Sequence, residues 1–240
     1  MFHVKQLDEK QAARPENSGF SLSERDFLAR HLPASLNADL TQIAPLLSHH
    51  LDELSLWAPR LNLVGEGTRD EWLRRHFLDS LLAVEPLREQ FGSSIGRLMD
   101  IGSGAGFPGL PLAAALRPEE TVLVEPRQRR AHFLRSVLRR WKRDDVRVEN
   151  LRLEATAGLM NVDVLVSRAT FSDVGDLLEG SVPLLRPGGL VMVLCSASAP
   201  KVELRAGLEH FEDLSPFRYV LPESDREHEL RFWRRFPYSA

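Results

Sequence analysis

The chain lacks three features that would each indicate a special class of protein. Its single cysteine, Cys195, excludes an internal disulfide framework and is typical of a protein from a reducing compartment. No stretch approaches roughly 18 uninterrupted apolar residues, and residues 1–19 lack the apolar core of a signal peptide. The formal net charge is only -3, which argues against a generally basic surface that coats nucleic acid. We therefore expect a cytoplasmic protein with no membrane segment.

What is present is the composition of an ordinary globular protein, with 43% apolar and 27% charged residues among 240. This length suits one full domain with an appendage. We expect a mobile tail at 1–20, a helical cap at 21–95 and the main domain at 96–240, in a monomeric protein. His49 and His50 have no second cluster at metal-ligand spacing, so we expect no metal site and a helical pair that is solvated or partly buried.

The first third of the chain is helical in its pattern. Apolar residues recur at helical spacing over 21–32, 36–61 and 69–87. Pro45 and Pro59 are expected at helix ends or kinks, because proline lacks the backbone donor that a helix interior requires.

From Arg97 onward, β-prone apolar runs alternate with helical patterns. The predicted strands are 98–102, 121–125, 146–150, 162–167 and 189–195. The predicted helices lie near 109–117, 127–143, 171–186 and 200–210. Such alternation predicts an α/β fold with a mostly parallel, doubly wound sheet. The runs at 217–222 and 229–236 have no helix between them and predict an antiparallel C-terminal hairpin.

The most informative stretch is RLMDIGSGAGFPGLPLA, residues 97–113. An apolar run ends in Gly102, Gly104 and Gly106, and an apolar helical pattern follows. This order predicts a strand, a tight glycine turn and a helix N-terminus. Glycine permits positive φ and close approach of a ligand, and the unpaired N–H groups at the helix start face that ligand. We expect a small, nucleotide-like ligand here.

Two kinds of ligand are compatible with this turn. The run GAGFPG matches the dinucleotide fingerprint G-x-G-x-x-G, and Glu125 follows at the expected distance, so an NAD-binding oxidoreductase is one hypothesis. Asp100, however, stands at the strand end, where its charge would repel a diphosphate and attract an amino group. Phe107 and Pro108 also crowd the turn. These residues favour a cationic ligand.

Two further motifs, VDVLVSRA at 162–169 and LLRPGGLVMVL at 184–194, complete a pattern that resembles the class I S-adenosyl-L-methionine-dependent methyltransferases. Adding HFLDSL (76–81), VEPRQRRAHFL (124–134) and RLE (152–154), the chain resembles the bacterial small-subunit rRNA guanine-N7 methyltransferases, the RsmG or GidB family. The resemblance extends from about Trp57 to Gly189. It implies a Rossmann-like class I fold with a helical cap, and methyl transfer to N7 of a guanosine in 16S rRNA. The implied partner is 16S rRNA or the small ribosomal subunit.

The same resemblance assigns roles to individual residues. On the cofactor side it implies contacts from Asp100, Gly102, Gly104, Gly106, Phe107, Glu125, Leu153, Glu154 and Arg168, with Glu125 on the ribose and the pair 153–154 on the adenine. On the target side the candidates are Arg168, His76, Asp79 and Asn62. No acid–base pair is required, because guanine N7 already carries a free lone pair and catalysis would come from alignment.

Several of these positions admit a plainer interpretation. His76 and Asp79 lie three residues apart on one helix face and would equally anchor the cap to the sheet, while Asn62 would equally fix a turn. The helix at 127–143 carries an arginine-rich outer surface that is either solvated or in contact with RNA. Its candidate RNA-binding residues are Arg129, Arg130, Arg135, Arg139, Arg140 and Arg143.

The sequence departs from the family pattern on the predicted target side. The segment 194–198 reads LCSAS, without the lysine that the family usually has after the fifth strand. Similarly, 168–171 reads RATF and 62–65 reads NLVG. The missing lysine and the net negative charge keep open the alternative of a small-molecule methyltransferase. A non-catalytic RNA-binding module on the same fold is a further alternative, beside the oxidoreductase.

Overall fold

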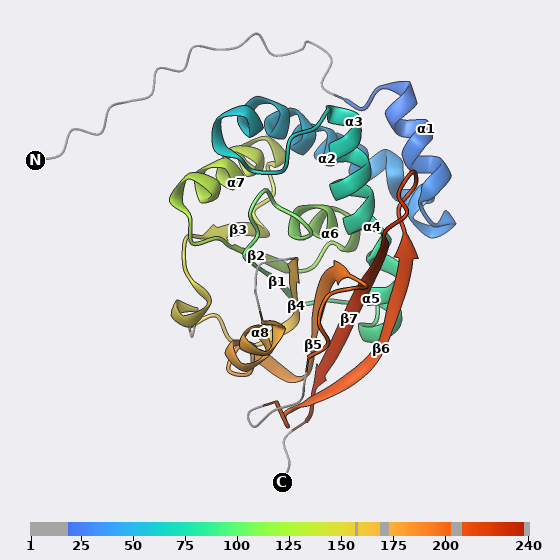
Figure 1. Ribbon diagram of the computed structural model, residues 1–240. Helices are drawn as coiled ribbons and strands as arrows, with labels where there is room; N and C mark the ends of the chain where they lie inside the picture. Colours follow the sequence, from blue (N-terminus) through green and yellow to red (C-terminus); the bar gives the residue numbers. More distant parts are fainter. Residues whose placement is uncertain (1–18, 157, 169–172, 203–207, 238–240) are drawn as a thin grey trace, which may run out of the picture.

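The computed structural model describes residues 19–156, 158–168, 173–202 and 208–237. Helices form its first part and a seven-stranded sheet its second (Figure 1). The first part consists of α1 (Leu22–His31), α2 (Ala34–Leu61), α3 (Arg69–Trp72), the π-helix η1 (Leu73–Leu78), α4 (Asp79–Leu82) and α5 (Val84–Phe91).

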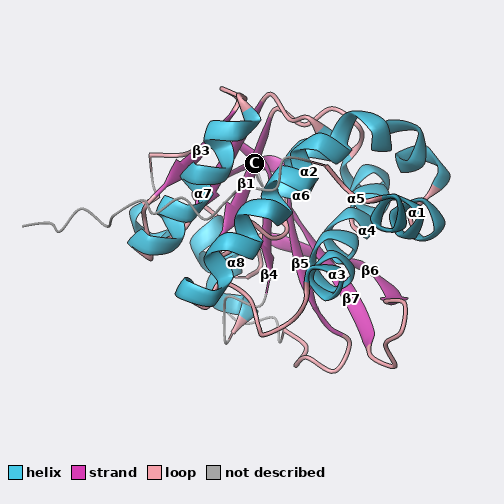
Figure 2. Ribbon diagram, turned by 90° about the horizontal axis from the view of Figure 1, so that it is seen from above, coloured by secondary structure: helices cyan, strands magenta, loops and turns pink. Residues whose placement is uncertain are grey.

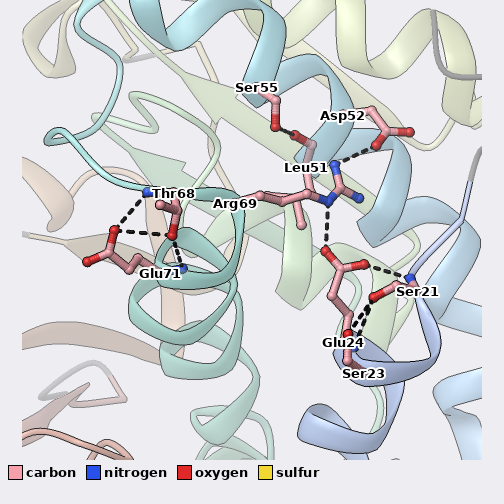
Figure 3. Close-up of polar contacts among 9 residues, drawn as sticks. All are labelled: Ser21, Ser23, Glu24, Leu51, Asp52, Ser55, Thr68, Arg69 and Glu71. Atoms are coloured by element: carbon pink, nitrogen blue, oxygen red, sulfur yellow. Dashed lines mark hydrogen bonds and ion pairs between the residues drawn. The ribbon is translucent and has the colours of Figure 1, made fainter.

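A partly buried ion-pair cluster fastens three of these helices together (Figure 3). Arg69, at the start of α3, donates from Nε to Glu24 of α1 and from Nη1 to Asp52 of α2, both at 2.7 Å. Glu24 also completes a capping box with Ser21, which begins α1. Because Glu24 and Asp52 are almost inaccessible to solvent, their charges depend on Arg69 for compensation.

The cap differs from its prediction at the start of the described chain. Pro45 and Pro59, expected at helix ends or kinks, both lie inside the continuous α2, so neither of them ends a helix. Residues 1–18 of the predicted tail lie outside the described part of the chain, whereas Phe20, also assigned to the tail, is only 5% exposed and belongs to the main hydrophobic core. Burial of an aromatic side chain of this size explains why the folded chain begins before the predicted boundary.

The sheet has the order β3-β2-β1-β4-β5-β7-β6. Its strands are β1 (Arg97–Ile101), β2 (Glu120–Val124), β3 (Val146–Glu149), β4 (Val162–Arg168), β5 (Leu185–Ser196), β6 (Phe211–Val220) and β7 (Glu227–Arg235). The first five pair in parallel, and β7 joins β5 and β6 antiparallel, so the predicted hairpin closes one edge. This order confirms the predicted Rossmann-like class I methyltransferase fold.

Helices cover both faces of the sheet, as seen from above in Figure 2. α6 (Gly109–Leu116) and α7 (Gln128–Trp141) share one hydrophobic core with the cap and one face of the strands. α8 (Val174–Ser181) packs on the other face in a second core. Alternation within β1 shows the division, because Leu98 belongs to the first core and Met99 to the second. This arrangement leaves the carboxyl ends of β1, β2 and β4 at the junction with the cap.

One predicted helix needs correction, and another lies partly outside the described residues. The helix expected at 171–186 is limited to α8 in the described residues, and Leu185 and Arg186 already belong to β5. Strand β5 therefore runs through Pro187 and the following glycines, which the sequence pattern favours as a turn. Residues 203–207 of the helix expected at 200–210 lie outside the described residues, and the flanking residues are not helical. No helix in the described parts is long and apolar enough to cross a membrane.

Candidate functional site

The glycine turn after β1 is tied to the neighbouring strand by backbone hydrogen bonds. The N–H groups of Gly102 and Ser103 both donate to the Val124 carbonyl, at 2.8 and 3.1 Å. Gly106 has a φ of +89°, and a Cβ atom there would lie 2.4 Å from Leu110 Cδ1. Only glycine combines this backbone conformation with such close packing against α6. The structure therefore contains the tight glycine turn that the sequence predicts between β1 and α6.

Glu125, at the end of β2, braces the turn from the side. Its Oε2 accepts the N–H of Gly104 at 2.9 Å, and its Oε1 accepts the N–H of Arg127 at 2.8 Å. The carboxylate is 3% exposed, so its orientation is held by these two bonds. Each oxygen retains a lone pair for a further donor. The geometry suits a ligand that brings two hydroxyl groups to this carboxylate.

Asp100, the second acidic residue of the site, lies beneath the turn and is completely buried. Its Oδ2 accepts the N–H of Gly109 at 3.1 Å, at the start of α6. Its Oδ1 is buried and has no hydrogen-bond partner. Burial raises the pKa of this carboxyl group to about 7. A buried acceptor without a donor is costly, and a bound group that carries N–H donors would satisfy it.

An aromatic cluster supports the turn from the cap side. The Phe107 ring stacks on His50 of α2 with centroids 4.8 Å apart, and meets Phe77 edge-on at 4.9 Å. His50 donates from Nε2 to the Ala105 carbonyl at 2.7 Å. Burial lowers the pKa of His50 to about 4, which keeps the imidazole neutral at pH 7. A side chain of the cap thus holds the backbone of the glycine turn.

His50 is a residue that the sequence analysis missed, since the His49–His50 pair was expected to be solvated or only partly buried. The ring of His50 is fully buried. The signal was present in its spacing, because His50 lies three residues after Leu47 and four before Leu54 in the buried stripe of α2. Within the described residues, no group of three potential ligands is placed to hold a metal ion.

Arg168, His76 and Asp79 meet at the end of β4. The Nδ1 atom of His76 accepts from Arg168 Nη2 at 2.8 Å, so the imidazole is a neutral acceptor. Partial burial and then the charge of Arg168 lower the pKa of His76 to about 3. Asp79 Oδ2 lies 3.5 Å from Arg168 Nη1, and its Oδ1 accepts from the Tyr219 hydroxyl. Tyr219, which the sequence analysis did not single out, brings the C-terminal hairpin into this cluster.

The π-helix η1 explains how the cap presents this pair. His76 lies within η1, and Asp79 begins α4 directly after it. A π-helical turn widens the backbone spiral and is frequent at functional sites. Here both side chains reach the same guanidinium, so they anchor the cap to the sheet and position Arg168 at the same time.

A cavity of about 430 Å³ joins these parts. Its walls combine cap and sheet residues. Of the residues predicted for the cofactor side or the target side, the wall contains Gly102, Gly104, Phe107, Glu125, Arg168 and His76. Asp100 lies beneath the wall and not in it. This volume falls within the range of small-molecule sites, which runs from about 300 to 1,000 Å³.

Six of the predicted cofactor-side and target-side residues lie outside the cavity wall, namely Asp100, Gly106 and Asp79, described above, and Leu153, Glu154 and Asn62. Leu153 is half-buried in the short 3-10 helix η2 (Leu153–Ala155), where it packs closely against Gly180 of α8. Glu154 is exposed beside it. Asn62 ends α2 in a left-handed conformation, and its carbonyl accepts from Arg130 Nη2 at 3.1 Å. The adenine-contact role of 153–154 and the target-side role of Asn62 therefore remain predictions.

The arginines of α7 and of the segment after it divide into two groups. Arg140 lies 3.8 Å from the buried Glu53, and Arg143 pairs with Asp145. Arg135 donates to the Val148 carbonyl at 3.2 Å. Arg129 and Arg139 are exposed. Only Arg130 of the six predicted RNA-binding residues lines the cavity.

Comparison with known proteins agrees with this geometry. A family model described as "GidB: rRNA small subunit methyltransferase G" matches residues 43–227. The ribosomal RNA small subunit methyltransferase G of Myxococcus xanthus is 34% identical over 84% of this chain and 91% of its own length. The Chloroflexus aggregans protein of the same name is 39% identical over 60% of this chain, and the match spans only 60% of that relative.

Among solved structures, a mutant of MtNAS superposes with a TM-score of 0.55 over 90% of this chain and 81% of that one, at 16% identity. This likeness supports the fold alone. The family model and the Myxococcus xanthus relative each cover well over two thirds of the chain. The chain therefore belongs to the GidB family, the rRNA small subunit methyltransferases G.

Proposed function

We propose that the chain transfers a methyl group from S-adenosyl-L-methionine to N7 of a guanosine in 16S rRNA, acting in the cytoplasm. The observation that carries this proposal is that one cavity brings the glycine turn and Glu125 together with Arg168 and His76. The first pair of features suits a nucleoside that carries an amino acid, and the second suits an incoming base. The names of the relatives support rRNA of the small subunit as the substrate.

The residues present fit this cofactor. The unpartnered Oδ1 of Asp100 would accept from the amino group of the methionine part, and Glu125 would accept from the ribose hydroxyls. The glycine turn would present its backbone to the ligand, because Gly102 and Gly104 line the cavity and carry no side chain. When bound, the cofactor supplies a methyl group on a positively charged sulfur.

The protein would contribute alignment and not proton transfer. Guanine N7 carries a lone pair at neutral pH, so no base is needed to activate it. The neutral His76 and the carboxylate of Asp79 hold the Arg168 guanidinium at the cavity wall, where its N–H groups would donate to the guanine O6. Alignment of this kind can lower a barrier by about 7–11 kcal/mol.

The test is methylation of rRNA in vitro. Small ribosomal subunits and naked 16S rRNA from cells that lack the gene are incubated with the protein and labelled S-adenosylmethionine, and N7-methylguanosine is mapped by chain cleavage. We expect one modified guanosine. Methylation of free small acceptors with none on rRNA would instead identify a small-molecule methyltransferase.

Calorimetry separates the remaining alternative functions. Binding of S-adenosylhomocysteine without binding of NAD is the expected result, and the opposite result would restore the oxidoreductase hypothesis. An Arg168→Gln variant should methylate rRNA more slowly than the wild type, and weaker binding of S-adenosylhomocysteine to this variant would show that Arg168 also contacts the cofactor. If the wild type binds both RNA and S-adenosylhomocysteine yet transfers no methyl group to any RNA or small acceptor, the chain is a non-catalytic module.

A further inference from the structure

A second hollow adjoins the cavity. It is a groove of about 570 Å³ between the end of α2 and the start of α7. Four arginines line it, namely Arg60, Arg127, Arg129 and Arg130, and no acidic residue of the described chain does. Arg127 and Arg130 also line the cavity, so the groove and the cavity share a wall. We call this feature the arginine groove.

The arginine groove is strongly cationic although the chain as a whole is slightly acidic. Arg60, Arg127 and Arg129 are exposed, and their side chains form no ion pair with another residue of the described structure. Burial and then the neighbouring charge of Arg127 lower the pKa of Arg130, against an opposing effect of the Glu125 carboxylate, so the guanidinium groups of Arg127 and Arg130 repel one another. An anion bound between them would relieve this repulsion. By contrast, Arg140 lies near the buried Glu53.

The backbone adds to the same potential. α7 begins at the groove, and its N-cap residue, Arg127, provides no side-chain cap. A helix of 14 residues without a cap presents N–H groups and the positive end of its dipole at this point. The Arg130 side chain donates to the Asn62 carbonyl and so joins the two sides of the groove.

We infer that the arginine groove binds backbone phosphates of the RNA strand next to the target nucleotide, an inference that rests on the proposed function. An RNA strand that delivers a base into the cavity must continue past the cavity walls. The wall that the cavity shares with the arginine groove carries the positive charges of Arg127 and Arg130. The planar guanidinium fork matches the phosphate oxygens and can bind them in a bidentate manner. The contacts position the strand without reading its sequence.

The test uses two arginines that do not line the cavity. The double variant R60Q/R129Q is compared with the control R25Q/R226Q, which removes two exposed arginines on α1 and in the β6–β7 turn. Filter binding to 16S rRNA is measured at several KCl concentrations. We expect R60Q/R129Q to bind roughly tenfold more weakly and to lower the slope of log affinity against log salt by about 2, one for each lost contact. S-adenosylhomocysteine binding should be unchanged.

Phosphate-ethylation interference provides a second measurement. Phosphates whose ethylation blocks the wild type should include one or two that no longer matter to R60Q/R129Q. If the wild type methylates rRNA but R60Q/R129Q keeps the wild-type slope, the groove assignment is wrong and the proposed function stands. Equal losses in the control would show an effect of total charge and would also overturn the assignment. If the wild type neither binds nor methylates rRNA, the proposed function fails first.

Discussion

Replacing His50 by glutamine tests whether a buried, neutral imidazole of the cap supports the glycine turn. Glutamine is uncharged at every pH and retains an N–H donor for the Ala105 carbonyl, but it loses the stacking on Phe107. The variant should be less stable than the wild type at pH 7.5. This difference should shrink as the pH falls, because acid destabilises the wild type through His50 and cannot do so in the variant.

The magnitude follows from the pKa of His50, which burial lowers from 6.5 to about 4. A group whose pKa is lower in the folded state binds more protons in the unfolded state, so its contribution is present above pH 6.5 and is lost as the pH falls toward 4. The difference between the folded and unfolded pKa values of His50 lowers the free energy of unfolding of the wild type by about 2 kcal/mol at pH 5 and about 3 kcal/mol at pH 4, relative to pH 7.5. The stability difference between wild type and H50Q should narrow by these amounts.

Urea unfolding followed by tryptophan fluorescence at pH 7.5, 6.0 and 5.0 measures this narrowing. His210 supplies the control, because it is exposed directly before β6, and the stability difference between wild type and H210Q should be small at each pH. A constant difference between wild type and H50Q from pH 7.5 to 5.0 would refute the reasoning. It would show that the His50 ring can be protonated in the folded protein without loss of its contacts.

Three further predictions concern the site itself. Since the carboxyl group of Asp100 has a pKa of about 7, S-adenosylhomocysteine should bind more tightly as the pH rises from 5.5 to 7.5. Calorimetry on D100N should show weaker binding that does not change over this pH range. If D100N keeps the pH dependence of the wild type, Asp100 is not the group that causes it. Gly106→Ala should lower the free energy of unfolding by about 2–4 kcal/mol, because φ is +89° and the new Cβ atom would clash with Leu110. The control Gly65→Ala has open space around the new Cβ atom and should leave the melting temperature nearly unchanged. Equal melting temperatures of the two variants would contradict the clash. Asp79 Oδ2 and Arg168 Nη1 lie 3.5 Å apart, so Asp79→Asn and Arg168→Gln should show a coupling free energy of about 1–3 kcal/mol in a double-mutant cycle of unfolding free energies. Additive effects would mean that the two side chains do not stabilise each other.

The parts of the molecule that were predictable from sequence are those with a local cause. The strands of the parallel sheet are buried on both faces and so appear as continuous apolar runs, as 121–124 does. The glycine turn is similarly local, because the φ of Gly106 restricts the residue type at that position. Each of these features follows from neighbours in the sequence.

The rest depends on contacts between distant residues. Arg168 meets His76 across 92 positions, and Tyr219 meets Asp79 across 140. The type of each residue suggests a role, but only the packing of the cap and the hairpin against β4 shows that they form one cluster. The interpretations of His76 and Asp79 as an anchor and as a target-side pair are therefore compatible, because the same bonds that fasten the cap also hold Arg168.

Binding of the cofactor should be linked to docking of the cap, because the cavity needs both parts. Leu63, Val64 and His76 come from the helical segment, and Phe107 and Glu125 come from the sheet segment. A ligand that binds only the assembled cavity stabilises that assembly in proportion to the logarithm of its concentration relative to Kd. The boundary near residue 95 is accordingly a boundary in secondary structure and not in the hydrophobic core, which continues across it.

The segment 194–198, which lacks the lysine that the family usually has after the fifth strand, can be interpreted from the contacts around it. A buried cation on the paired strand, Arg231, donates to Glu229 and to the Ala199 carbonyl, each at 2.7 Å, and is 8% exposed. The charge of Arg231 is therefore compensated within the protein by Glu229 and is not available to RNA. Residues 194–198, at the end of β5, include no lysine that could contact a phosphate instead. The arginine groove lies between the end of α2 and the start of α7, and α7 follows β2, a strand in the other half of the sheet. A chain that lacks the lysine after β5 would thus depend more heavily on the arginine groove for phosphate contacts, and its salt dependence should reside there.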